Sequence, residues 1–90
     1  MLDVRYSTQF KKDFKLCSKR HYKLELLQKV IDTLRIPAAL PEKNKDHSLT
    51  GDWVGYQECH ILPDWLLIYR VVGEELQLAR TGTHSDLFGK

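Results

Sequence analysis

The stretch WLLIYRVV, from Trp65 to Val72, decides the fold that this sequence predicts. Only Arg70 interrupts its apolar and aromatic side chains, and residues of these kinds favour strands. The run is far too short to span a membrane, which takes roughly 20 residues. A strand that is apolar at almost every position needs cover on both of its faces. We therefore predict that residues 65–72 form the central strand of a sheet.

Two further strands are predicted on either side of it. Residues 53–62 are rich in aromatic and β-forming side chains and end at a Pro63-Asp64 turn. Gly73-Glu74 forms a tight turn after the central strand, and residues 75–81 alternate between apolar and polar. Short connections of this kind join antiparallel neighbours. The second half of the chain is therefore expected to be an antiparallel meander.

The first half of the chain predicts a short strand and two helices. Residues 2–6 alternate as a strand does, and Ser7 or Thr8 can cap the helix that follows. Residues 23–35 predict a second helix, whose broad apolar face should pack on both the sheet and the first helix. Pro37 ends that helix, and residues 37–48 are expected to form a long loop. The residues expected on the buried face of the first helix are Phe10, Phe14 and Cys17.

These elements predict one domain, residues 1–90, with the order β-α-α-β-β-β. The fold class is α+β, with the helical hairpin packed on one face of a mainly antiparallel, four-stranded sheet. The other face is then open to hold a site, and residues 82–90 form a short tail. The N-terminus lacks the basic-then-apolar pattern of a secretory signal, so we expect a cytoplasmic protein. Cys17 and Cys59 follow no metal-binding or redox spacing and are expected to be free thiols in the core.

Positive charge is concentrated in the helical half. Up to Ile36 there are nine basic and four acidic residues, whereas the rest of the chain has five basic and eight acidic residues. Lys11, Lys15 and Lys19 recur every four residues along the first helix, a spacing at which like charges repel each other. This lysine stripe suggests an anionic partner, and the plainer alternative is a solvated, lysine-rich helix surface.

Three histidines and one aspartate lie at strand ends and in loops of the second half. They are His47, His60, Asp64 and His84. An antiparallel meander can bring such ends together, although each residue alone could be an ordinary surface or turn residue. An unperturbed imidazole has a pKa of about 6.5, so one histidine can donate a proton while another accepts one near neutral pH. Cleavage of RNA without a metal needs such an acid and base, together with a cation that stabilises the charged phosphorane.

Arg80 is the candidate for that cation. Period-two alternation places it on the same side of its strand as Leu76 and Leu78, which is otherwise apolar. A guanidinium there must emerge at the end of the strand or meet an anion. That anion is either a phosphate of RNA or a nearby carboxylate of the protein, and the sequence leaves both open.

Other uses of these residues have less support. A metal site could also use histidines and an aspartate, but no HExxH or CxxC spacing supports one, so we predict no metal and no cofactor. Trp65 and Phe88 are the aromatic residues near the cluster. Core packing is the default for both, and stacking on an unpaired RNA base is the alternative.

Three segments of the second half resemble motifs of YafQ-type toxins of the RelE/ParE superfamily. They are KDHSLTGDW at residues 45–53, CHILPDWLLIY at residues 59–69 and RTGTHSDLF at residues 80–88. They occur in the family's order, and the helical hairpin before them has the expected length. On that resemblance the chain is identified as a member of this family.

The resemblance implies the toxin of a bacterial type II toxin–antitoxin system. Its activity would be that of a ribosome-dependent endoribonuclease that cuts mRNA and leaves a 2′,3′-cyclic phosphate. The catalytic residues implied are His47, His60, Asp64 and His84, and the RNA-binding residues implied are Arg80, Trp65 and Phe88.

Within that scheme we expect His84 to be the general acid. Asp64 is expected to be the general base, with His60 as the rival base. His47 would position or stabilise the phosphate that Arg80 neutralises. The lysine stripe would bind ribosomal RNA.

The expected partners are a cognate antitoxin of the DinJ or RelB type, the ribosome with its RNA, and mRNA; no membrane is expected. A flexible antitoxin segment would wrap the basic surface. Two other functions stay open. One is a gyrase-directed toxin of the ParE branch, which generally lacks this histidine set, and the other is a non-catalytic RNA- or protein-binding module.

Overall fold

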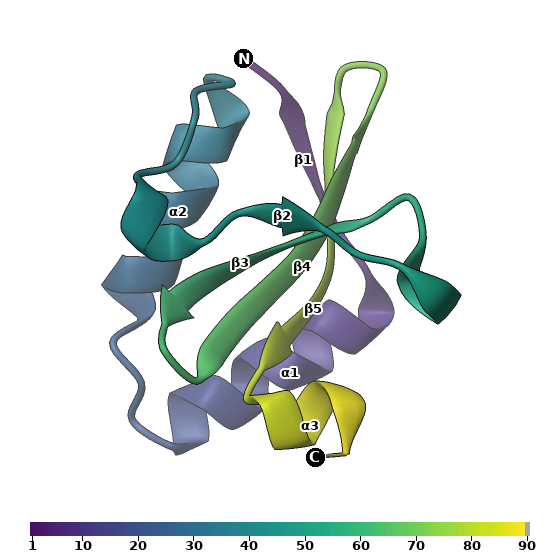
Figure 1. The fold of residues 1–90 in the computed structure, drawn as a ribbon. Coiled ribbons are helices and arrows are strands. Elements are labelled where there is room, and N and C mark those ends of the chain that lie inside the picture. Colours follow the sequence, from purple (N-terminus) through teal and green to yellow (C-terminus); the bar gives the residue numbers. More distant parts are fainter. Residues whose placement is uncertain (90) are drawn as a thin grey trace.

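A computed structural model describes residues 1–89, so Lys90, the last residue of the predicted domain and tail, lies outside the described part. Figure 1 shows a twisted sheet with two long helices against it and a third, short helix near the C-terminus. No helix in residues 1–89 has the length and apolarity needed to cross a bilayer. The elements are β1 (Asp3–Tyr6), α1 (Thr8–Lys19), α2 (Leu24–Arg35), the 3₁₀ turn η1 (Glu42–Asn44), β2 (His47–Ser48), the 3₁₀ turn η2 (Gly51–Trp53), β3 (Gln57–Leu62), β4 (Trp65–Val72), β5 (Glu75–Gly82) and α3 (His84–Phe88).

The sheet has five strands in the order β1-β5-β4-β3-β2. Strand β1 runs parallel to β5, and the other neighbouring pairs are antiparallel. The predicted α+β class and the meander β3-β4-β5 are confirmed. The predicted count of four strands is wrong, because β2 pairs with β3 inside the segment expected to be a loop. Two residues carry no periodic pattern, so only the pairing partner identifies this strand.

Strand β4 is the central strand, as its composition predicts. Leu67 and Tyr69 belong to the core that the sheet shares with α1 and α2. Leu66 and Ile68 point to the opposite face and are nevertheless fully buried, with 0% exposed surface. Both faces of this strand are therefore covered, which explains why almost every side chain in it is apolar.

The two long helices begin and end close to the predicted residues. Ser7 caps α1 by accepting a hydrogen bond from the Phe10 amide at 2.9 Å. Phe10 and Cys17 are buried as expected, and burial raises the pKa of the Cys17 thiol to about 11. The prediction for Phe14 is wrong, because its side chain remains 38% exposed.

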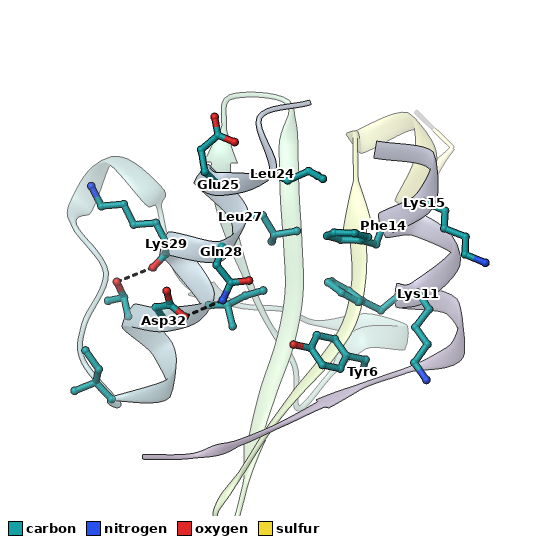
Figure 2. A pocket seen from close by; sticks show the side chains of 14 residues that line it. Tyr6, Lys11, Phe14, Lys15, Leu24, Glu25, Leu27, Gln28, Lys29 and Asp32 are labelled. Atoms are coloured by element: carbon teal, nitrogen blue, oxygen red, sulfur yellow. Dashed lines mark hydrogen bonds between the residues drawn. The ribbon is translucent and has the colours of Figure 1, made fainter. Parts of the chain in front are cut away.

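Phe14 stays exposed because α2 does not pack along α1. A groove of about 950 Å³ opens between the two helices, and it is lined by side chains from both of them. Figure 2 shows Phe14 and Tyr6 on one side of this groove and Leu24 and Leu27 on the other. The prediction that α2 packs on the first helix is therefore wrong. The prediction that it packs on the sheet is not affected. We call this surface the helix groove.

A bulge in β5 reverses the alternation of its side chains. Tyr69 pairs with Leu78 but Ile68 pairs with Arg80, so Ala79 is an extra residue without a partner in β4. Arg80 consequently lies on the face opposite Leu78, and the prediction that it shares a face with Leu76 and Leu78 is wrong. Strict period-two counting fails here because one inserted residue moves every later side chain to the other face.

The predicted tail contains the short helix α3. Thr83 caps it by accepting from the Asp86 amide, and the Asp86 carboxylate accepts from the Thr83 amide, both at 3.0 Å. This is the reciprocal capping box, and its Ser/Thr-x-x-acid pattern is present in the sequence. Gly82 precedes it with φ +155°, and a Cβ there would lie 3.0 Å from the Asp86 side chain. Glycine is favoured because a side chain would crowd Asp86 and would take a backbone conformation that other residues rarely adopt.

A buried ion pair joins α1 to β5 where β1 has ended. The Arg80 guanidinium donates to the Asp13 carboxylate through Nε at 2.7 Å and through Nη2 at 3.2 Å. The same carboxylate accepts from the buried Thr81 amide at 3.2 Å, which satisfies a backbone donor that β1 no longer reaches. The carboxylate alternative for Arg80 is therefore present in the structure.

Replacing Asp13 by alanine should lower the free energy of unfolding by about 3 kcal/mol, because it leaves a guanidinium and a buried amide without their acceptor. Urea denaturation of the wild type and the variant measures this loss. Asp52→Asn, at an exposed aspartate, is the matched control and should change stability by less than about 0.5 kcal/mol. Equal stability of wild type and Asp13→Ala would show that the pair does not hold α1 to the sheet.

Candidate active site

Four strands contribute side chains to one row across the sheet. His47 pairs with Glu58, Glu58 with Ile68, and Ile68 with Arg80. Directly opposite residues share a face, so this row lies on the side of the sheet away from the α1–α2 core. The next row consists of His60, Leu66 and Gly82. The two rows place both strand histidines and the arginine on a single surface.

The three histidines of the second half do come together. The ring centroids of His47 and His60 are 6.3 Å apart, and those of His60 and His84 are 5.7 Å apart. Asp64 joins them through its contact with His84. The fold therefore assembles the predicted cluster from β2, β3, the β3–β4 turn and the first residue of α3. His21 is not among these contacts.

Each of the three imidazoles has an oxygen acceptor at Nδ1. His47 Nδ1 is 2.6 Å from the Lys45 carbonyl, and His60 Nδ1 is 3.2 Å from the Pro63 carbonyl. His84 Nδ1 is 2.6 Å from Asp64 Oδ1. Because these oxygens only accept, Nδ1 must carry the hydrogen in every ring. Nε2 is therefore the nitrogen left to exchange a proton with a substrate.

Glu58 is a site residue that the sequence analysis missed. Its side chain is 5% exposed, and Oε1 lies 3.5 Å from His47 Nε2 and 3.6 Å from His60 Nε2. A carboxylate so placed stabilises positive charge on either ring. The signal that could have found it is its position two residues before His60 on the same strand, which puts the two side chains on one face.

Asp64 holds His84 by two hydrogen bonds. Its Oδ1 accepts from the His84 amide at 3.0 Å and from the His84 ring at 2.6 Å. These bonds, the backbone one first, lower the pKa of the Asp64 carboxyl below its usual value. A carboxylate with a lowered pKa is a weak base, so the geometry suits Asp64 better to orienting His84 than to removing a proton itself.

The loop that carries His47 is fixed from both of its sides. Asn44 is buried and donates to the His60 carbonyl at 2.7 Å. The Tyr69 hydroxyl donates to the Asp46 carboxylate at 2.6 Å, and burial and this bond raise the pKa of Tyr69. A loop tied to β3 and β4 in this way presents His47 in one position beside the other two rings.

Helix α3, which carries His84, is held by α1. Arg20 at the C-terminal end of α1 donates to both carboxylate oxygens of Asp86, at 2.6 and 3.2 Å. This guanidinium holds the pKa of Asp86 at about 2, well below its usual value of 3.8. A five-residue helix has little stability of its own, so the bidentate pair and the capping box fix its position.

Arg80 keeps part of its guanidinium for a ligand. Nε and Nη2 bind Asp13, and Nη1 has no hydrogen-bond partner within residues 1–89. The Asp13 contact also fixes the side chain, because two parallel bonds to a carboxylate allow one orientation only. A fixed guanidinium with a free edge can still bind a phosphate.

The other residues predicted to bind RNA lie in three different surroundings. Trp65 is 2% exposed, packs on Tyr22 and donates to Thr81 Oγ1 at 2.9 Å. This burial fits core packing, the default role of Trp65, although the residue also lines a hollow beside Tyr22, and stacking of a base on it stays a prediction. Phe88 at the end of α3 is exposed and stays a candidate. The three residues of the lysine stripe are exposed on α1, and Lys11 and Lys15 border the helix groove instead of the histidines.

No metal centre fits the described residues. Metal ligands converge on one point at roughly 2.0–2.3 Å. Within residues 1–89, no group of three or more histidine, cysteine, aspartate and glutamate side chains converges in that way. Cys17 and Cys59 are both buried free thiols, as expected from their spacing.

The family model and the curated relatives that match this sequence indicate the same family of proteins. The model of the family described as "Bacterial toxin of type II toxin-antitoxin system, YafQ" matches residues 2–89. The mRNA interferase toxin YafQ of Escherichia coli strain K12 is 46% identical over an alignment of 90 residues. The alignment covers 97% of this chain and 96% of that protein.

Solved structures extend the likeness to three dimensions. The E. coli DinJ–YafQ complex contains a chain that is 43% identical, with a TM-score of 0.90, covering 99% of this chain and 100% of that one. A metal-bound toxin from Helicobacter pylori is 41% identical, with a TM-score of 0.92, covering 98% of this chain and 100% of that one. The metal is a property of that protein.

Asp86→Asn should lower stability at neutral pH, because it removes the charge that pairs with Arg20. Asp86 has a lowered pKa in the folded state, so its contribution is complete above pH about 4 and is lost as the pH falls through about 2. Urea denaturation at several pH values should therefore show the wild type and the variant converging below pH 4. In an Arg20→Gln background the same substitution should have little effect, and an undiminished effect there would contradict the pairing.

Proposed function

The chain belongs to the YafQ family of bacterial toxins of type II toxin–antitoxin systems, and from that premise we propose that it is an endoribonuclease that cuts mRNA on the ribosome. One observation carries this proposal. Three imidazoles, each with Nδ1 engaged by an oxygen, come together beside Glu58, and His47 and His60 lie on the same face of the sheet as a fixed arginine. The E. coli relative is named an mRNA interferase, in keeping with that chemistry. Such a substrate would place the protein in the cytoplasm.

His84 is the general acid in this proposal. Its Nδ1 donates to Asp64, so Nε2–H of the imidazolium is the proton that can be given to the departing 5′-oxygen. Asp64 stabilises that imidazolium and fixes the orientation of the ring. The arrangement is the one that acid–base enzymes use when a carboxylate orients a histidine.

His60 is the general base, in place of the Asp64 assignment that the sequence favours. Its Nδ1–H is engaged with the Pro63 carbonyl, so the Nε2 lone pair is available to accept the proton of the ribose 2′-hydroxyl. Glu58, 3.6 Å away, stabilises the positive charge that this step creates. The revision follows from the pKa of Asp64, which is lowered and makes that carboxylate the weaker base.

The bonds made and broken then balance without a further reactant. The 2′-oxygen attacks the phosphorus as His60 takes its proton, and the bond from phosphorus to the 5′-oxygen breaks as His84 supplies a proton. The products are a 2′,3′-cyclic phosphate and a 5′-hydroxyl. Arg80 and His47 neutralise the charge of the phosphorane between these two steps.

The antitoxin is the second partner that we propose. The YafQ chain of E. coli is found in complex with DinJ. The helix groove offers an apolar floor with Phe14 exposed and lysines along its border, and Figure 2 shows Lys11 and Lys15 directed away from the groove. An amphipathic, acidic antitoxin segment fits such a surface. This places the antitoxin beside the lysine stripe, as expected for a segment that wraps the basic surface.

The gyrase-directed and non-catalytic alternatives are less well supported. Neither function requires three neighbouring imidazoles whose Nδ1 atoms are all engaged by oxygen acceptors. A map of mRNA ends during induced expression, combined with an assay of DNA supercoiling, tests all three functions. New mRNA ends would identify the nuclease, and inhibited supercoiling would identify a gyrase poison. The absence of both effects would identify a binding module.

His84→Ala should reduce cleavage of mRNA on programmed ribosomes by about 100-fold or more, because it removes the proton donor for the leaving oxygen. The measurement is a single-turnover rate with mapped 5′ ends, and the expected ends carry hydroxyls. Glu74→Ala, at an exposed residue of the β4–β5 turn, is the control and should cut at the wild-type rate. Cleavage by His84→Ala at the wild-type rate, or 5′-phosphate ends, would refute the scheme.

The choice of base has its own test. If His60 is the base, the Asp64→Asn variant should cut more slowly but keep the acidic limb of the wild-type pH–rate profile. If Asp64 is the base, the wild-type limb should lie below the usual pKa of an aspartate carboxyl, because that pKa is lowered here, and the variant should lose the limb. The profile of the wild type and the variant, measured from about pH 3 to pH 8, separates these two assignments.

Phe14→Glu should weaken antitoxin binding by about 10-fold or more, because it places a charge on the apolar floor of the helix groove. Titration of the toxin with its cognate antitoxin measures the dissociation constant. Val54→Glu, at an exposed apolar residue outside the groove, is the matched control. Unchanged affinity of Phe14→Glu would place the antitoxin on another surface, and unchanged cleavage of mRNA would show that the variant is folded.

A further inference from the structure

A hollow of about 530 Å³ lies beside the β3–β4 turn. Its walls come from the α1–α2 connection, from the start of α2 and from the turn itself. Its lining includes Tyr22, Leu26, Trp65 and Leu62, and 47% of the surface of Leu62 is exposed. The hollow is large enough for a nucleobase with its ribose, and its walls are mainly apolar.

The hollow is continuous with the candidate active site. Asp64 and Thr83 belong to its lining, and Asp64 is also the residue that holds the His84 ring at 2.6 Å. Thr83 is the residue before His84 and caps the helix that carries it. A ligand that fills the hollow would therefore lie next to the residues that hold the general acid.

Charge at the rim suits a nucleotide. Lys23 and His21 lie at the outer edge, where both are exposed. A base placed between Tyr22 and Leu62 would exchange water for apolar contact, and its phosphate could approach the Lys23 ammonium. Unpaired nucleotides are bound in this way by an apolar or aromatic surface beside a cation.

We propose that this hollow binds the base of the nucleotide on the 3′ side of the cut, the one whose 5′-oxygen departs. This inference rests on the proposed function, because the side is set by the assignment of His84 as the acid. The departing oxygen must lie at His84 Nε2, and the residues that adjoin His84 also border the hollow. The nucleotide attached to that oxygen is therefore the one closest to it.

Leu62→Glu tests the proposal because it fills the mouth of the hollow with a carboxylate. The expected result is that the toxin concentration giving half-maximal cleavage on programmed ribosomes rises about 10-fold, while the maximal single-turnover rate stays within about twofold. Val71→Glu is the matched control, since Val71 is 50% exposed on β4 outside the hollow and gains the same charge. It should behave as the wild type does.

A second change, made in the message, identifies the occupant. An mRNA with an abasic residue on the 3′ side of the cut should weaken the wild-type toxin by about the same factor as Leu62→Glu. The variant should lose no more on that message, because the contact is already absent. An abasic residue on the 5′ side should leave the effect of Leu62→Glu unchanged.

Three results would overturn the proposal. One is additivity of the two changes, which would show that Leu62 contacts the ribosome and not this base. Another is coupling to the 5′ base instead of the 3′ base. The third is a loss in Val71→Glu equal to that in Leu62→Glu. If the wild type cuts no mRNA, the proposed nuclease fails first and this inference fails with it, so the two failures are distinguishable.

Discussion

The burial of β4 on both faces is the constraint from which the rest of the structure follows. One face of the strand joins the core beneath α1 and α2, and the other face buries Leu66 and Ile68 completely. Those two residues are the partners of the site residues in the neighbouring strands. A shift of one residue would turn them toward the helices and move His60 and Glu58 off the functional face. The packing of an apolar strand thus fixes the register of polar groups that do not contribute to the core.

Backbone carbonyls largely determine the orientation of the histidine rings. Two of the three rings are oriented by carbonyl oxygens within three residues of them, and the third is oriented by a carboxylate. The local chain path alone therefore selects the tautomer at His47 and His60. A fixed tautomer removes one reorganisation step before proton transfer, which is the physical advantage of a preorganised site. The arrangement at His47 and His60 depends on the path of the adjoining chain, so each of these residues lies near the end of a strand, beside the segment that orients its ring.

Helix α1 connects the two surfaces of the molecule. Asp13 and Arg20 extend from it to Arg80 and to the helix that carries His84. Phe14 and two members of the lysine stripe lie along the helix groove on the same helix. A partner bound in the groove would contact the element that holds both the arginine and the acid in place. The groove and the catalytic face share no residue, but they share this support.

Some features of the protein were determined by the sequence alone. The apolar run of β4 identified the central strand, the turns around it identified the meander, and the chemistry of imidazole and carboxylate identified the cluster of His47, His60, Asp64 and His84. These predictions succeeded because they depend on local composition and on short connections. Only the tertiary structure decided the side on which Arg80 lies, the burial of Trp65, the inclusion of Glu58 and the presence of β2. The side of Arg80 depends on a bulge against β4, the presence of β2 on its pairing with β3, and the burial of Trp65 on packing against Tyr22. No local pattern records these partners.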